Sequence, residues 1–266
     1  MSQIKYSKHL IMFSCMQHNQ PNFRLIVAAL VLLFLTISVS GQDSVRVRDF
    51  ETWNAIAIEK ELFDGKLKLG FAQELRLDEN STHINNYFTS LNADYNLNKH
   101  LEVGLEYRFI KDNKDEKGYQ KGRRVHLDTR YRHKIDRLTL DYRIRLQHRT
   151  NLPYGEEEDP DWSNKVRLRG KAKYDFRNWK IDPWFSAEIF YTGEKYTVNY
   201  IESIDELKQV SGFERVRVSL GSAYTIKKVG KIGFYYRIEK EFASYPGVFN
   251  TPGTFHIAGI DFTFKL

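Results

Sequence analysis

The chain has 266 residues, of which 41 are Lys or Arg and 34 are Asp or Glu, so its formal net charge is +7. This excess of basic residues is too small to indicate a nucleic-acid-binding protein, and no nucleic-acid partner is expected. The single cysteine, Cys15, excludes a framework of disulfide bonds.

Residues 1–41 have the layout of a secretory signal peptide. Three basic residues precede an apolar run over residues 25–37, and small residues follow it. The alternative is an uncleaved anchor, but a membrane-spanning helix needs about 20 apolar residues. We therefore expect cleavage after Ser40 or Gly41. Residues 42–266 then form one barrel domain with 38 basic and 34 acidic residues, a net charge of +4, and no cysteine.

Polar and apolar residues alternate in eleven segments of the remaining chain. Residues 101–109, for example, read Leu-Glu-Val-Gly-Leu-Glu-Tyr-Arg-Phe. Successive side chains of a strand point to opposite faces, so each segment has one apolar and one charged face. The predicted strands cover residues 50–62, 66–77, 84–97, 101–110, 123–134, 138–148, 163–176, 180–191, 214–226, 231–241 and 254–266.

Short turns alternate with longer polar loops between these segments, and no apolar run in residues 42–266 could span a membrane as a helix. Both features predict an all-β fold, an antiparallel transmembrane β-barrel in the outer membrane of a Gram-negative bacterium, in contact with its lipid and lipopolysaccharide. Because such barrels usually have an even number of strands, we expect twelve, with ten as the alternative. The extra strand would come from residues 44–48 or 192–211. A soluble barrel with its apolar face inward would have to enclose many Tyr and Phe side chains.

The end of the chain resembles the terminal assembly signal of outer-membrane proteins. Gly259 is followed by Phe262 and Phe264, and Leu266 ends the chain where Phe is more common. An edge strand at this position can pair with an edge strand of the barrel-assembly machinery. That machinery is therefore an expected partner.

The chain also resembles an uncharacterised family of Gram-negative outer-membrane barrels, classed as a domain of unknown function. The resemblance covers nearly all of residues 45–266 and implies fold and location, but no activity. It is carried by residues 49–53 (Asp-Phe-Glu-Thr-Trp), 73–76 (Gln-Glu-Leu-Arg), 106–108 (Glu-Tyr-Arg), 142–145 (Tyr-Arg-Ile-Arg) and 215–221.

Nine cations share the charged faces of three consecutive predicted strands. We predict that they face the lumen, where they are candidates for contact with an anion. They are Arg130, Arg132, Arg143, Arg145, Lys165, Arg167, Arg169, Lys171 and Lys173. One interpretation is an ion-pair network with seven carboxylates, namely Glu74, Glu102, Glu106, Asp128, Asp141, Glu188 and Glu239. The others are a basic wall that selects anions, and a site for lipopolysaccharide or phosphate.

Aromatic residues are predicted in two settings. Most fall near strand ends, as in the interfacial belts of membrane proteins. Trp184 and Phe190 instead share the inward face with Glu188, where we expect them to pack the interior. The expected belt comprises Tyr95, Tyr107, Tyr131, Tyr142, Trp162, Tyr174 and Trp179.

No motif of a known hydrolase, nucleotide-binding loop or metal site is present, so no catalytic residue, metal or cofactor is predicted. His126, His148 and His256 are far apart in sequence, and no serine forms a recognisable motif with them. His148, at the extracellular end of a strand and near residues 156–161, is the one enzyme-like position.

The sequence thus predicts a barrel that is not an enzyme. Its leading function is a narrow pore or passive channel with a basic lumen, which takes a small anionic solute. The alternatives are a closed structural or ligand-binding barrel, and an outer-membrane hydrolase at the extracellular rim that would require His148.

Overall fold

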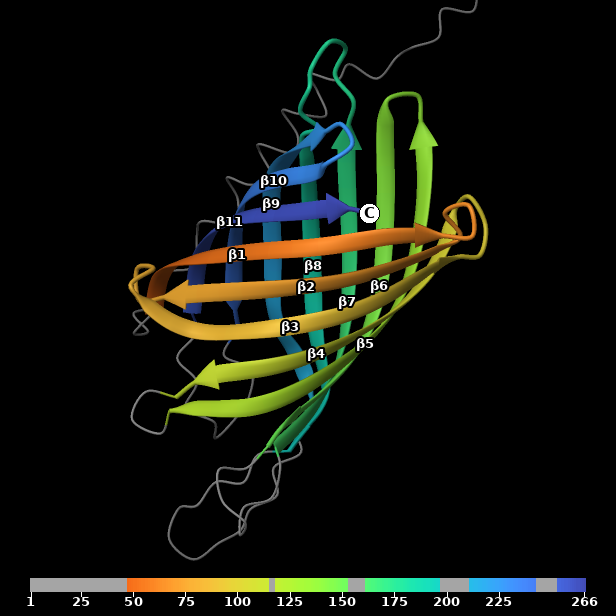
Figure 1. Ribbon diagram of the computed structural model, residues 1–266. Coiled ribbons are helices and arrows are strands. Elements are labelled where there is room, and N and C mark those ends of the chain that lie inside the picture. Colours follow the sequence, from red (N-terminus) through yellow and green to blue (C-terminus); the bar gives the residue numbers. More distant parts are fainter. Residues whose placement is uncertain (1–46, 115–117, 153–160, 197–210, 243–252) are drawn as a thin grey trace, which may run out of the picture. The chain divides into compact units, whose positions relative to one another are not determined.

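The computed structural model describes residues 47–114, 118–152, 161–196, 211–242 and 253–266, and the predicted signal peptide (1–41) lies outside them. The described chain is all-β, with eleven strands (Figure 1). They are β1 (Val47–Leu62), β2 (Leu67–Asp78), β3 (His83–Asn96), β4 (Leu101–Asn113), β5 (Tyr119–Ile135), β6 (Leu138–Asn151), β7 (Asp161–Tyr174), β8 (Trp184–Tyr196), β9 (Gly212–Ile226), β10 (Gly230–Glu241) and β11 (Gly253–Lys265). None of the described residues belongs to a helix long and apolar enough to cross a membrane.

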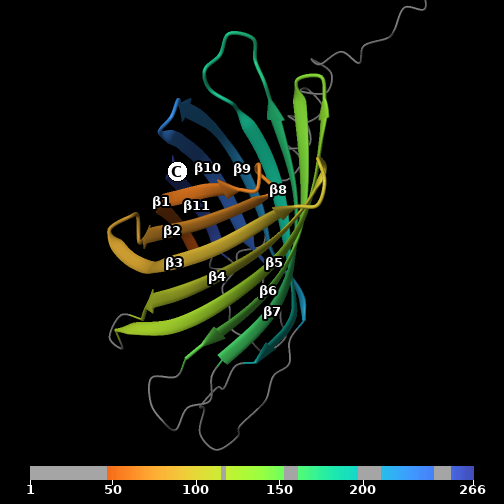
Figure 2. The same cartoon turned by 45° about the vertical axis from the view of Figure 1, so that its right-hand side comes forward.

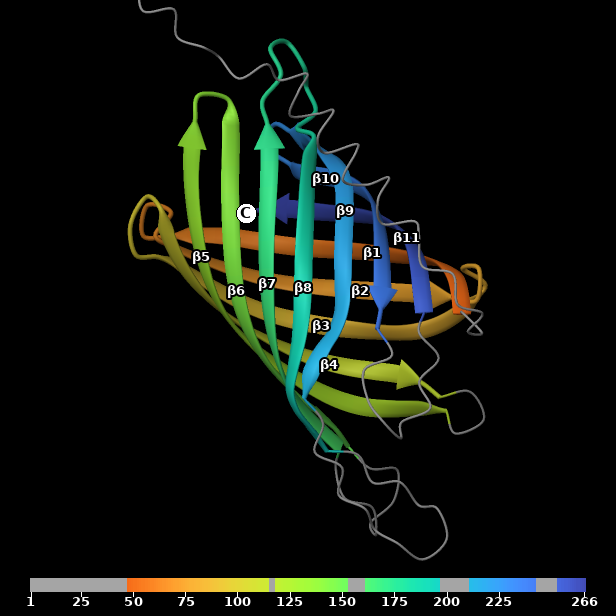
Figure 3. The same ribbon diagram turned by 180° about the vertical axis from the view of Figure 1, so that it is seen from behind.

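The strands form one closed barrel in chain order. Consecutive strands pair antiparallel, and β1 pairs with β11 in parallel to close the ring, from Val47 opposite Gly253 to Glu59 opposite Lys265. Figures 1 and 3 show β1–β4 crossing β6–β8 on the opposite wall, and Figure 2 shows β2–β5 following one another around the barrel.

The eleven predicted segments are confirmed, but the preference for an even number of strands is wrong. Val47 and Arg48 extend β1 instead of forming a strand of their own, so the first and last strands run in the same direction. Closure therefore requires a parallel pair, and the barrel is mixed rather than wholly antiparallel. Residues 197–210, where a further strand was considered, lie outside the described residues.

The connections differ between the two ends of the barrel. At the short-turn end, residues 63–66, 97–100, 136–137, 175–183 and 227–229 join the strands. At the other end, here called the long-loop end, residues 79–82 join β2 to β3, and β1 and β11 begin. The other four connections at this end include residues outside the described ones. Leu266 lies at the short-turn end, where its backbone N–H donates a hydrogen bond to the Glu59 carbonyl oxygen at 2.9 Å.

Two predicted boundaries differ from the structure. The connection between β7 and β8 is a nine-residue segment rather than a short turn at Arg177-Asn178, because β8 begins at Trp184, after Pro183. Proline has no N–H for the ladder and is tolerated at the start of a strand. In addition, β6 continues to Asn151, three residues beyond the predicted end, so Thr150 lies on a strand.

The described strands turn their apolar side chains outward. Ile56, Leu105, Leu168 and Leu220 are each more than half exposed, whereas alternate positions hold buried charged groups such as Asp128 and Glu188. The soluble alternative required the opposite arrangement. This outward face is the direct result of the alternation in the sequence.

Gly259 on β11 lies directly opposite Tyr235 on β10. A Cβ atom at this glycine would clash with the Tyr235 ring, which covers the backbone at that point. An aromatic ring packed over a glycine of the neighbouring strand helps to fix the register. Gly259 therefore has a packing role in addition to its predicted place in the assembly signal.

We expect Gly259→Ala to destabilise the folded barrel by about 1–3 kcal/mol, the usual cost of overpacking. The measurement is the urea midpoint of the barrel refolded in detergent. Gly170→Ala is the matched control, because a Cβ there meets no heavy atom within 4 Å. Equal midpoints for the two variants would contradict the packing role of Gly259.

Candidate functional site

The interior of the barrel is charged. The nine predicted cations all lie on the inward face of β5, β6 and β7, which are adjacent in the wall. Register places Arg130 opposite Arg143, and Arg143 opposite Arg169. Like charges on directly opposite residues of adjacent strands repel one another, so carboxylates must lie between them.

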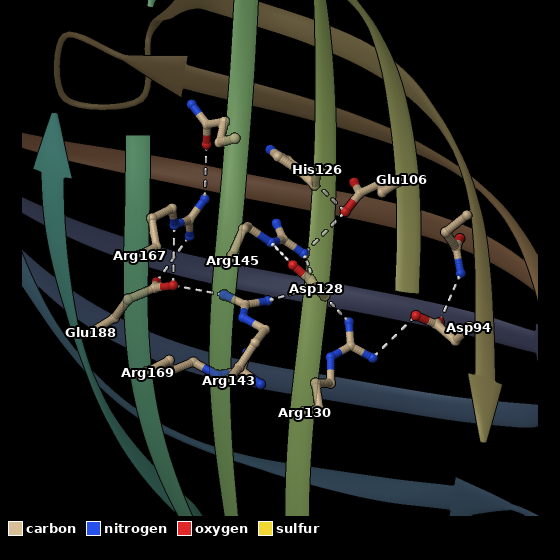
Figure 4. Close-up of polar contacts among 12 residues, drawn as sticks. Asp94, Glu106, His126, Asp128, Arg130, Arg143, Arg145, Arg167, Arg169 and Glu188 are labelled. Carbon is tan, nitrogen blue, oxygen red and sulfur yellow. Dashed lines mark hydrogen bonds and ion pairs between the residues drawn. The ribbon is translucent and has the colours of Figure 1, made fainter. Parts of the chain in front are cut away.

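The predicted carboxylates supply this compensation. Each of the seven makes an ion pair with at least one arginine. Asp128 is the centre of one group (Figure 4): its two oxygens accept from Arg145 Nε at 2.6 Å and Nη2 at 2.7 Å, and Arg130 Nη2 donates to it at 3.0 Å. Arg145 also reaches Glu106 at 3.2 Å, and Glu106 in turn bonds the buried His126 at 3.1 Å.

Glu188 of β8 is the centre of a second group. Arg143 Nη2 donates to one carboxylate oxygen at 2.7 Å, and Arg167 reaches both oxygens at 3.1 and 3.0 Å (Figure 4). Arg217 of β9 lies 3.3 Å from the same carboxylate. The Glu188 side chain is only 4% exposed, so three guanidinium groups share one buried negative charge, although Arg217 also pairs with Glu239.

Aromatic rings extend these groups across the barrel. Arg217 lies over the Phe190 ring at 4.7 Å and over the Trp53 ring at 5.4 Å, and thereby connects β8 with β1 through the interior. Arg76 and Arg237 also lie over Trp53, at 3.6 and 4.8 Å. Guanidinium groups over aromatic faces are attracted by the ring quadrupole. Phe190 thus packs the interior, as predicted.

A cavity of about 450 Å³ remains beside these contacts, lined by thirteen Lys and Arg side chains and only three carboxylates, Glu74, Glu188 and Asp261. It follows β7 past four successive inward residues, Lys165, Arg167, Arg169 and Lys171. The six residue-to-residue steps from Lys165 to Lys171 correspond to about 20 Å at about 3.3 Å per step. The cavity is therefore elongated along the wall and strongly cationic.

Three of the cavity's cations make no ion pair with a carboxylate among the described residues. Arg124 has a buried Nε without a hydrogen-bond partner, and its electrostatic neighbours include Arg149 and Arg108. Lys171 lies over the Trp184 ring at 4.1 Å, and Arg237 Nε donates to the Ser219 hydroxyl at 3.0 Å. A small anion in the cavity would compensate these charges.

The nine cations and seven carboxylates were predicted to face the lumen, but Arg76, Arg124, Arg217, Arg237 and Trp53 were not assigned to the site. All five are on inward positions of strands that were predicted. The alternation alone could therefore have found them. Their partners across the barrel could not be found in this way, because those contacts depend on ring closure.

A family described as "Protein of unknown function (DUF2490)" matches residues 50–246. The chain belongs to this family. The match confirms the resemblance to a family of unknown function over most of the expected range. No curated protein is similar enough in sequence to match.

The predicted assembly residues of this DUF2490 chain lie on β11 and just beyond it. Phe262 and Phe264 contact each other edge-on with ring centroids 4.4 Å apart, and Leu266 is exposed. β11 is already paired on both sides, with β10 and β1, in the closed barrel. Any pairing with assembly machinery would thus precede closure.

The three histidines of the DUF2490 chain that were considered for catalysis have different settings. His126 is completely buried in the interior, and His256 bonds the Tyr236 hydroxyl at 2.6 Å on the outside. His148 is exposed on the outward face of β6, where it bonds Asn164 and Thr150. Residues 156–160, to which the sequence-based hydrolase interpretation also referred, lie outside the described residues. The described residues include no cluster of three or more potential metal ligands.

Removal of the negative charge at Glu188 should destabilise the barrel strongly. Glu188→Gln leaves three arginines without their shared carboxylate, and breaking a buried ion pair costs about 3–5 kcal/mol. The readout is the urea midpoint in detergent. Glu61→Gln is the control, because the Glu61–Lys265 pair at 3.7 Å is exposed. A Glu188→Gln midpoint as high as that of the control would contradict the role of Glu188.

Proposed function

We propose that this DUF2490 chain is an outer-membrane β-barrel whose cation-lined interior passes small anions. The outward face supports a lipid environment: it consists largely of exposed aliphatic and aromatic side chains. A tilted strand needs about 9–11 residues to cross a bilayer, and the strands contain 12 to 17 residues. The predicted signal peptide, which would direct export, agrees with this location.

The cationic cavity is the observation that carries the functional part of the proposal. Walls of Arg and Lys favour anions in pores, and the cavity lining has ten more cations than carboxylates. Its position along β7 offers a sequence of neighbouring sites rather than a single one. Because Trp53, Arg217 and Phe190 fill part of the interior, only small solutes fit.

The second candidate is a closed barrel without conductance. It is favoured by the same cross-barrel contacts, which join β1 to β8 through Arg217. In this case the cavity holds a bound anion and the ion pairs stabilise the barrel. Measurement of current distinguishes the two candidates.

The orientation in the membrane can be tested with single cysteines in a Cys15→Ser background. Lys114→Cys lies at the long-loop end and Lys99→Cys in a turn at the short-turn end, and both side chains are exposed. A membrane-impermeant maleimide on intact cells should label Lys114→Cys alone, and Lys99→Cys only after permeabilisation. Equal labelling of both on intact cells would contradict the proposed location.

Conductance is tested by single-channel recording in a planar bilayer under a KCl gradient. We expect discrete current steps whose reversal potential lies between zero and the equilibrium potential of chloride. Arg124→Gln with Lys171→Gln should shift that potential toward zero, because it removes two cations from the cavity without breaking an ion pair.

The matched control for this experiment is Lys60→Gln with Lys121→Gln, which removes two exposed cations that do not line the cavity. Its reversal potential should equal that of the unmodified barrel. A correctly folded barrel that gives no current steps would overturn the anion pathway and leave the closed barrel.

A further inference from the structure

A hydrogen-bonded row of three side chains crosses the outward face of β6 and β7 near the long-loop end. His148 Nδ1 lies 2.7 Å from Asn164 Oδ1, and His148 Nε2 lies 3.1 Å from the Thr150 hydroxyl oxygen. Figure 3 shows β6 and β7 side by side in the wall. Register places His148 opposite Asn164. The row therefore results from strand pairing and not from a loop.

The two contacts define the tautomer of the neutral imidazole. The Asn164 carbonyl oxygen can only accept, so the hydrogen of neutral His148 lies on Nδ1. Nε2 is then left with its lone pair and accepts from the Thr150 hydroxyl. A hydroxyl, a base in hydrogen-bond reach of it, and a third group that orients the base are the parts of an activated nucleophile.

The neighbours of Thr150 suit the same chemistry. Arg123 of β5 and Trp162 of β7 are its register partners on either side. Arg123 is exposed, and no ion pair to a carboxylate is found for it in the described parts of the chain. Directly opposite residues on one face are neighbours, so register puts a cation beside Thr150, where negative charge would develop during attack. The Trp162 ring stacks on His148 with centroids 6.4 Å apart.

The pairing of β7 with β8 is irregular next to Asn164. The register between β7 and β8 shifts between Asn164 and Lys165. Bulges change the direction of side chains and are frequent beside active sites. The shift adjoins the residue that orients His148.

The surroundings indicate the substrate. Leu146 and Val166 are opposite each other on the same outward face, one inward–outward repeat away from His148 and Asn164, and both are exposed. Leu127, opposite Leu146 on β5, continues this apolar surface. An exposed apolar surface beside a polar row at the strand ends fits an acyl chain with its ester group at the level of Thr150.

We propose that Thr150, His148 and Asn164 form a catalytic triad that hydrolyses carboxylic esters of membrane lipids. The Thr150 oxygen attacks the ester carbonyl while its proton moves to His148 Nε2. The ester C–O bond breaks, His148 returns the proton to the leaving alcohol, and an acyl–Thr150 ester remains. Water then attacks this ester, gives one proton through His148 to Thr150, and releases the fatty acid.

The test uses the purified full chain in mixed micelles of detergent and phosphatidylglycerol, with release of fatty acid as the readout. Thr150→Ala and His148→Ala should each lower the rate by about 10²-fold or more, the usual contribution of such a group. Thr150→Ser should retain activity, because serine supplies the same hydroxyl. Asn164→Ala should lower the rate and Asn164→Asp should restore it in part.

His256→Ala is the matched control, since this histidine is also on the outward face and bonds a hydroxyl, that of Tyr236, but has no orienting amide among its described contacts. Its rate should equal that of the unmodified chain. Heat-modifiable migration on a gel shows that each variant is folded, and a fluorophosphonate probe should label Thr150→Ser but not Thr150→Ala.

Folded, unmodified protein that releases no more fatty acid than His148→Ala would overturn the proposal, as would equal rates for Thr150→Ala and Thr150→Ser. Neither result depends on conductance, because micelles have no gradient across the barrel. The triad and the anion pathway can therefore fail independently.

Discussion

Closure of the ring is the constraint on which the rest of the structure depends. The parallel pairing of β1 with β11 gives the first and last strands partners on both sides, so that no sheet edge remains in the described barrel. Closure also confines every inward side chain to one narrow space. The charged residues of all strands must then compensate one another within that space.

This confinement explains why few carboxylates serve many arginines. Desolvation of an unpaired charge costs several kcal/mol, so an arrangement with one carboxylate between several guanidinium groups is more stable than isolated cations. Asp128 and Glu188 each have this position, and aromatic rings stabilise further guanidinium groups. The cations that face the cavity without a carboxylate are exceptions to this arrangement, and an anion is the simplest partner for them.

Much of the fold follows from the alternation in the sequence, because a period of two residues specifies both strand and face. The eleven segments, the inward cations and the inward carboxylates were predicted for this reason. The odd number of strands was not predicted. The general preference for even numbers cannot show that Val47 and Arg48 only extend β1. β8 begins at Trp184 rather than at the predicted residue 180, because Pro183 precedes it. This proline was visible in the sequence.

Contacts between strands that are distant in the ring were beyond sequence reasoning. Trp53 meets Arg217 only because closure through the β1–β11 pair leaves just β11 and β10 between β1 and β9 in the ring. The triad illustrates the same limit on the outside. His148 was singled out, but Thr150 was assigned to a loop, and Asn164 becomes its neighbour only through the register of β6 with β7.

The two faces of β6 and β7 can serve separate functions because neighbouring residues on a strand point in opposite directions. Arg145 and Arg167 point inward and belong to the ion-pair groups, whereas His148 and Asn164 point outward. A substitution on one face therefore leaves the side chains of the other face in place as long as the barrel folds. The same backbone also couples them in one respect: register holds both the ion pairs and the triad in position, so a shift of one residue between β6 and β7 would abolish both at once.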